Sequence, residues 1–93
     1  MELSERFIQA LEKEGFVSVY EWQDAPGTIR QPRQNKDKIS LCVADGSMSI
    51  DCAGTKTELR AGQRFDIPPQ VPYSITVGEA GVIYIVGEML EDY

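Results

Sequence analysis

The chain has 93 residues, of which 42% are hydrophobic and 26% charged, and its formal net charge is −6. This length gives one domain with a single core, and the acidic balance disfavours nucleic-acid binding, which depends on basic residues neutralising phosphates. No apolar run reaches the roughly 20 residues of a membrane span, and the start of the chain lacks a secretory pattern. We therefore expect a cytoplasmic protein without a nucleic-acid or membrane partner.

The first segment, residues 1–15, predicts an amphipathic helix. Ser4 is a candidate N-cap, and Gly15 is a candidate end of the helix. We expect one face of the helix to pack on the outside of the domain formed by residues 16–93. Four apolar residues at helical spacing define that face: Leu3, Phe7, Ile8 and Leu11.

From residue 16 onward, short β-rich runs alternate with turn signals, a pattern typical of an antiparallel barrel or sandwich. The turns contain glycine or proline and lie at 25–27, 45–46, 53–54, 61–62, 68–69 and 80–81. Eight strands are expected, at 16–22, 28–30, 38–44, 47–52, 57–60, 64–67, 73–77 and 82–86.

The Asp45-Gly46 dipeptide predicts a two-residue hairpin turn. Such a turn pairs residue 43 with 48, 41 with 50 and 39 with 52, and it places these side chains on one face of the sheet. Cys42 then lies on the opposite face from Cys52, so we expect both cysteines to be free.

Two features are compatible with a homodimer. Phe16, Tyr20 and Trp22 are expected on one strand face, where they would either pack beneath the helix or contact another subunit. Packing within the chain is the favoured interpretation of these aromatics. The apolar segment 82–86 is expected to be a sheet edge that could pair across a two-fold axis.

Two segments have the spacing of a known motif pair. In the first, Gly27, Arg33, Asn35, Ile39 and Gly46 are separated by five, one, three and six residues. This spacing resembles the first motif of the cupin family, G(X)5HXH(X)3–4E(X)6G, in which the two histidines and the glutamate are metal ligands. Arg33, Asn35 and Ile39 stand at those ligand positions.

The second segment contains Gly62, Pro68, Gln70, Tyr73 and Val77. It resembles the second cupin motif, G(X)5PXG(X)2H(X)3N, with Tyr73 at the position of the fourth ligand. Gln70 and Val77 depart from the motif's glycine and asparagine.

This resemblance implies a mainly β fold: a small single-domain antiparallel barrel of the cupin or jelly-roll kind with an N-terminal α-helix. It does not carry over the metal chemistry, because the chain contains no histidine and the acidic residues fall at turns or at outward positions. We expect neither a metal nor another cofactor.

The resemblance places the four ligand positions inside the barrel, and strand alternation adds further inward residues. We expect Arg33, Asn35 and Tyr73 to orient a small organic ligand. Arg33 would suit an anionic group on it, either a carboxylate or a phosphate. Taken one residue at a time, the favoured interpretation is a solvated basic loop for Arg33 and core packing for Tyr73, and the ligand contacts are the alternative. The expected apolar wall of the site consists of Ile39, Leu41, Met48 and Ile50.

Three functions follow from this pattern. The favoured one is a metal-free small-molecule-binding domain to which no catalytic residue is assigned. The second is a structural or interaction protein that acts as a homodimer and fills its barrel with its own side chains. The third is a metal-independent isomerase or lyase acting on a sugar or keto acid, which is the weakest because the chain lacks histidine.

Overall fold

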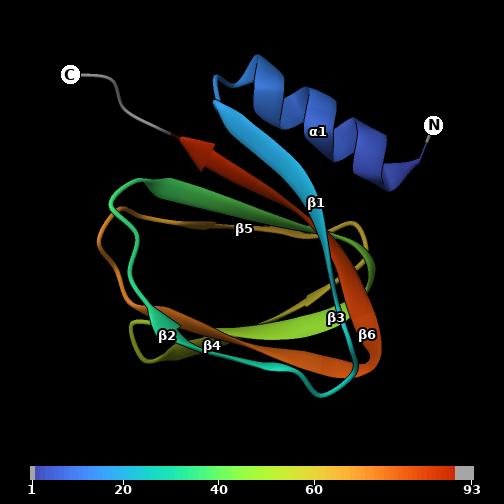
Figure 1. Ribbon diagram of the computed structural model, residues 1–93, viewed down its shortest axis with the longest axis vertical. Coiled ribbons are helices and arrows are strands. Elements are labelled where there is room, and N and C mark those ends of the chain that lie inside the picture. The colour runs from blue at the N-terminus through green and yellow to red at the C-terminus, as the bar shows by residue number, and fades with distance from the viewer. Residues whose placement is uncertain (1, 90–93) are drawn as a thin grey trace.

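The computed structural model describes residues 2–89, which form one helix and six strands (Figure 1). All strand pairs are antiparallel, so the mainly β fold with an N-terminal helix is confirmed. No helix within these residues is long and apolar enough to cross a membrane. The elements are α1 (Leu3–Lys13), β1 (Ser18–Asp24), β2 (Ile29–Arg33), β3 (Lys38–Cys52), β4 (Thr55–Arg60), β5 (Arg64–Ile67) and β6 (Tyr73–Met89).

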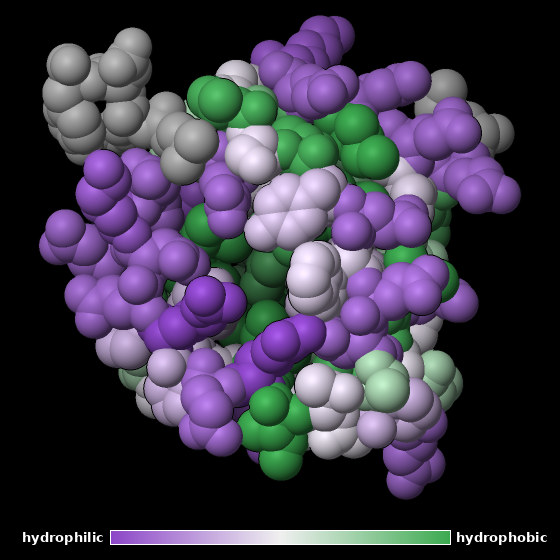
Figure 2. Space-filling view, viewed as in Figure 1, coloured by the Kyte–Doolittle hydropathy of each residue, from purple (hydrophilic) through white to green (hydrophobic). Residues whose placement is uncertain are grey.

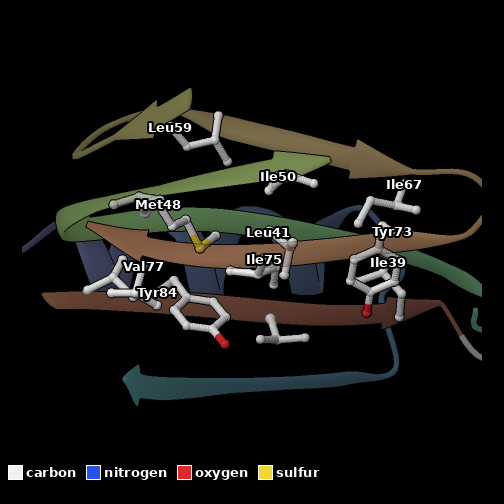
Figure 3. Packing of buried hydrophobic residues seen from close by; sticks show 13 residues of the cluster. Ile39, Leu41, Met48, Ile50, Leu59, Ile67, Tyr73, Ile75, Val77 and Tyr84 are labelled. Atoms are coloured by element: carbon white, nitrogen blue, oxygen red, sulfur yellow. The ribbon is translucent and has the colours of Figure 1, made fainter. Parts of the chain in front are cut away.

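Two long strands, β3 and β6, pair with each other along most of their length and connect two halves of the sheet. In one half, β1 pairs with the end of β6 and β5 pairs with the start of β3. In the other half, β2 pairs with the start of β6 and β4 with the end of β3. The apolar faces of both halves contribute to one core (Figure 3): Ile39, Leu41, Val43, Met48, Ile50, Leu59, Ile67, Tyr73, Ile75, Val77, Val82, Tyr84 and Val86.

The hairpin predicted at Asp45-Gly46 is wrong, because β3 continues through this dipeptide as one strand. Its register against β6 shifts between Val43 and Asp45 and again between Gly46 and Met48. These bulges interrupt the regular alternation of side chains between the two faces of the strand. Val43 and Met48 therefore both reach the core, and the predicted hairpin had placed them on one face as well. A glycine with positive φ occurs in β-bulges as well as in turns. Gly46, with a φ of +80°, lies in a bulge.

The bend in the two long strands depends on close contact between their backbones. A Cβ atom at Gly46 would overlap the carbonyl oxygen of Gly81. The turn expected at residues 80–81 is likewise absent, because β6 runs through it with Gly81 at a φ of +78°. The chain does form a two-residue hairpin at Ala53-Gly54, where both residues have positive φ and Cys52 pairs with Thr55.

The segment 82–86 lies in the middle of the sheet. It pairs with β1 on one side and with β3 on the other. The expectation that it forms an edge able to pair across a two-fold axis is therefore wrong, because its backbone groups already have partners within the chain.

Helix α1 packs on the outer face of the sheet, beside β1 (Figure 1). Leu11 and Phe16 are buried there against Cys42 and Ile85. Cys42 thus faces the helix while Cys52 packs against the core, and both cysteines are free, as predicted. The N-cap prediction was wrong, because the N-cap residue is Glu2 and no side chain caps the helix.

A group of charged side chains fastens the end of α1 to β5. Arg64 donates to both carboxylate oxygens of Glu14, at 2.7 and 2.8 Å, and its Nε donates to Asp66 at 2.8 Å. Ser40, which is fully buried, donates to the same Asp66 oxygen at 2.8 Å. Burial alone would raise the pKa of Asp66, but the hydrogen bonds from Arg64 and Ser40 hold the pKa below its usual range.

The close approach at the bend predicts that Gly46→Ala destabilises the fold strongly. We expect a loss of roughly 2–5 kcal/mol, because the methyl group adds a clash to the cost of a left-handed alanine. The matched control is Gly54→Ala, which shares the positive φ but has open space around the new Cβ. It should lose only about 1–2 kcal/mol. Urea unfolding of both variants measures the difference, and equal losses would contradict the close approach.

The hydrogen bonds of Asp66 predict a pH-dependent contribution to stability. Because the folded pKa is lowered, the ionised carboxylate stabilises the fold above about pH 4, and this contribution is lost as the pH falls through the folded pKa. Asp66→Asn should therefore be less stable than the parent at pH 7, and the gap in unfolding free energy should narrow toward pH 2. Chemical unfolding across this range tests the point, and a gap independent of pH would count against it.

Candidate functional site

A cavity of about 170 Å³ opens on the inner side of the sheet, between side chains of β1, β2, β3 and β6. Figure 2 shows a hollow on the face viewed in Figure 1, with apolar side chains at its floor and polar ones around its mouth. This volume is below the 300–1,000 Å³ of drug-sized sites. The cavity therefore suits a compact ligand.

The four positions that correspond to the cupin ligands lie together in this cavity. Arg33, Asn35, Ile39 and Tyr73 all contribute to its lining. Leu41 lines it as well, whereas Met48 and Ile50 are buried deeper in the core and do not. The aliphatic floor consists of Ile39, Leu41, Ile75 and Val86.

The phenol of Tyr73 is held at the cavity by Asn35, whose Nδ2 donates to the phenol oxygen at 2.8 Å. Burial raises the pKa of Tyr73, so the phenol stays neutral at physiological pH. Its oxygen is occupied as an acceptor, which leaves the hydroxyl hydrogen to donate to another group. Figure 3 shows the hydroxyl groups of Tyr73 and Tyr84 turned to the same side of the core cluster.

This set of side chains does not fit a transition metal. The Arg33 guanidinium has no acceptor atom, Ile39 has no polar atom, and an amide and a neutral phenol replace the remaining two ligands. Within residues 2–89, no group of three or more histidine, cysteine or acidic side chains could hold a metal ion.

A bulge in β2 directs two arginines into the cavity. Arg30 pairs with Ile75 and Arg33 pairs with Tyr73, so β2 has one residue more than β6 across this stretch. Ile75 and Tyr73 both face the core, and their partners share that face. Regular alternation would have put residues 30 and 33 on opposite faces, which is why sequence reasoning missed Arg30.

The charge of Arg30 is neutralised by Asp24. The guanidinium forms an ion pair with this carboxylate, whose side chain is only 5% exposed. Tyr84 and Trp22 donate to the same carboxylate, at 3.1 and 3.2 Å. Burial alone would raise the pKa of Asp24, but these three donors hold the pKa below its usual range. Asp24 is therefore ionised at neutral pH and ties β2 to β1 and β6.

Arg33 differs from Arg30 in having no such partner. Its guanidinium forms no hydrogen bond and no ion pair with any residue in the range 2–89. It lies close enough to Tyr73 and Tyr20 to influence their ionisation. Among the described lining residues, Arg33 is thus the cation whose charge is available to a ligand.

Three further lining residues were missed by sequence reasoning. Glu88 alternates with Tyr84 and Val86 on the cavity side of β6, but the strand was expected to end at residue 86. Tyr20 and Trp22 were expected to share a face with Phe16, and this prediction was wrong. Phe16 packs beneath α1, whereas the two other aromatics line the cavity in an edge-to-face pair with centroids 6.4 Å apart.

No protein-family model and no curated protein matches the chain, but solved structures do. The Schizosaccharomyces pombe Cnp3 cupin domain has a TM-score of 0.74 at 16% identity, covering 78% of this chain and 55% of that one. The Drosophila melanogaster CENP-C cupin domain has a TM-score of 0.71 at 19% identity, covering 77% and 60%. KdgF from Halomonas sp. has a TM-score of 0.69 at 18% identity, covering 80% and 69%.

The chain thus spans between about half and two-thirds of the length of these proteins. Identities below a fifth transfer the fold but not the function. The architecture, the antiparallel pairing and the position of the cavity residues agree with the two motif-like segments. The chain has the fold of the cupin superfamily.

Proposed function

We propose that this domain binds a small organic anion in the cavity, with the carboxylate of the ligand on Arg33. The observation that carries the proposal is the guanidinium of Arg33, which lines a cavity with an aliphatic floor and has no hydrogen-bond partner in residues 2–89. A guanidinium offers a planar fork of donors that matches a carboxylate. Its neighbour Arg30 contributes little net charge, because Asp24 already pairs with it.

The remaining lining residues suit the rest of such a ligand. Tyr73, positioned by Asn35, provides a neutral hydroxyl donor beside Arg33. The aliphatic floor accepts a short hydrocarbon chain, and Ile39 and Leu41 belong to it. Met48 and Ile50 support this floor from within the core. A short-chain carboxylic acid satisfies both the size of the cavity and this distribution of polar groups, and the proposal assigns no catalytic step.

A second candidate function is an interaction domain, as a homodimer or with another protein. It is favoured by exposed apolar residues, among them Val17 at 66% and Ile29 at 65% exposure. A Drosophila melanogaster CENP-C structure of similar fold contains the partner CAL1. Sedimentation velocity distinguishes the candidates, because a dimer that weakens in Ile29→Ser supports this function and a monomer at all concentrations counts against a homodimer.

The proposal predicts that Arg33→Gln weakens binding of 3-methyl-2-oxobutanoate, a branched short-chain carboxylate, by about 10- to 100-fold. This range corresponds to the loss of a hydrogen bond to a charged group, ~1.5–3 kcal/mol. Titration calorimetry at neutral pH measures the affinities. Thermal unfolding should be nearly unchanged, because the side chain is exposed and forms no ion pair within residues 2–89.

The matched control is Arg60→Gln, which removes the same charge from an exposed position on β4 outside the cavity. It should leave the affinity within about twofold of the parent, because the charge lies among solvent and is screened. Equal weakening by both substitutions would indicate a nonspecific charge effect. No measurable binding to the parent protein across a panel of short-chain carboxylates would overturn the proposal.

A further inference from the structure

The cavity contains a negative group as well as a positive one. Glu88 lines it from the end of β6, next to Val86 and Tyr84 on the same side of the strand. Its Cα pairs with that of Ile39, so the carboxylate enters the cavity beside the position where the cupin motif has its own acidic ligand. Within residues 2–89, its hydrogen-bond partner is the Tyr20 hydroxyl, at 3.3 Å.

Glu88 and Arg33 share the cavity without neutralising each other. They form no ion pair within 4.0 Å, although both line the same cavity. Both influence the same phenols. Burial is the main cause that raises the pKa of Tyr20, Glu88 raises it further, and Arg33 acts in the opposite direction. Burial is also the main cause that raises the pKa of Tyr73. The hydrogen bond from Asn35 and the charge of Arg33 lower this pKa, and Glu88 raises it.

This arrangement differs from the paired ions elsewhere in the chain. Arg30 contacts Asp24 directly, and Arg64 contacts both Glu14 and Asp66. In the cavity, by contrast, Arg33 and Glu88 form no ion pair with each other, and aliphatic side chains line the floor. A ligand with one charge would satisfy one of these groups and be repelled by the other.

We propose that the ligand is a small zwitterion, namely an α-amino acid with an apolar side chain. Its carboxylate lies on Arg33, its ammonium group on Glu88, and its side chain on the aliphatic floor formed by Ile39, Leu41, Ile75 and Val86. The inference rests on the proposed function and specifies its ligand class. Tyr20 adds aromatic surface to the cavity, which favours an ammonium group over a neutral one. The ring of Trp22 already has the Arg30 guanidinium over it, 5.6 Å from the centroid.

The test compares alanine, valine and leucine with the 2-oxo acid and the simple amine of each. The 2-oxo acid lacks the ammonium group, and the amine lacks the carboxylate, so each removes one of the two proposed contacts. We expect at least one amino acid to bind the parent protein about tenfold or more tightly than both of its analogues. Titration calorimetry at neutral pH and low salt gives the three affinities without any substitution in the protein.

Two variants then assign the contacts. Glu88→Gln should weaken amino-acid binding to about the level of the 2-oxo acid and leave the 2-oxo acid unchanged or tighter. Arg33→Gln should weaken both ligands. The matched control is Glu79→Gln, which removes an exposed carboxylate outside the cavity and should change neither affinity.

The outcomes separate the two proposals. If the 2-oxo acids bind as tightly as the amino acids and Glu88→Gln has no effect, the zwitterion inference is overturned and the binding of organic anions stands. If the amines bind best, the role of Arg33 is overturned as well. If no compound of the panel binds the parent protein, both proposals fall.

Discussion

The pairing of β3 with β6 runs along most of both strands and joins the two halves of the sheet. These strands belong to both halves of the sheet, so each of the other four strands is attached to one of them. Their bend brings the two apolar faces together, and it requires the backbones at Gly46 and Gly81 to approach more closely than any side chain permits. One steric constraint thus positions both the core and the cavity.

Backbone irregularities also determine the chemistry of the cavity. The bulge in β2 turns Arg30 and Arg33 to the same side, and the two arginines then have different environments. Arg30 belongs to a partly buried ion pair with Asp24, whose hydrogen bonds connect three strands. Arg33 has no such partner among the described residues, so its charge is available at the mouth. Two residues of one type therefore have a structural and a proposed binding role.

The sequence predicted the fold because its turn residues keep a rare common spacing. Gly27, Gly46, Gly62 and Pro68 were informative together, and the ligand positions they imply do converge in one cavity. What failed was the local interpretation of glycine. A positive φ at Gly46 serves a bulge here, and only contacts distant in sequence distinguish a bulge from a hairpin turn.

The same limitation explains the missed site residues. Strand alternation predicts which side chains face inward only where the pairing register is regular. A single extra residue in β2 turns Arg30 to the same side as Arg33, into the cavity. Glu88 was missed because the apolar run ends at Val86 although the strand continues to Met89. Pairing with β1 and β3 extends the strand beyond the apolar residues, and this tertiary effect leaves no local signal in the sequence.

Our main proposal is that the cavity between β1, β2, β3 and β6 binds a small organic carboxylate. Its most direct test is a ¹H–¹⁵N correlation spectrum of the protein titrated with short-chain carboxylates, including amino acids. We expect saturable shifts that concentrate on Arg33, Asn35, Tyr73 and Glu88, with little change in the residues under α1. Saturable shifts centred on another surface, or spectra that no carboxylate of the panel changes, would contradict it.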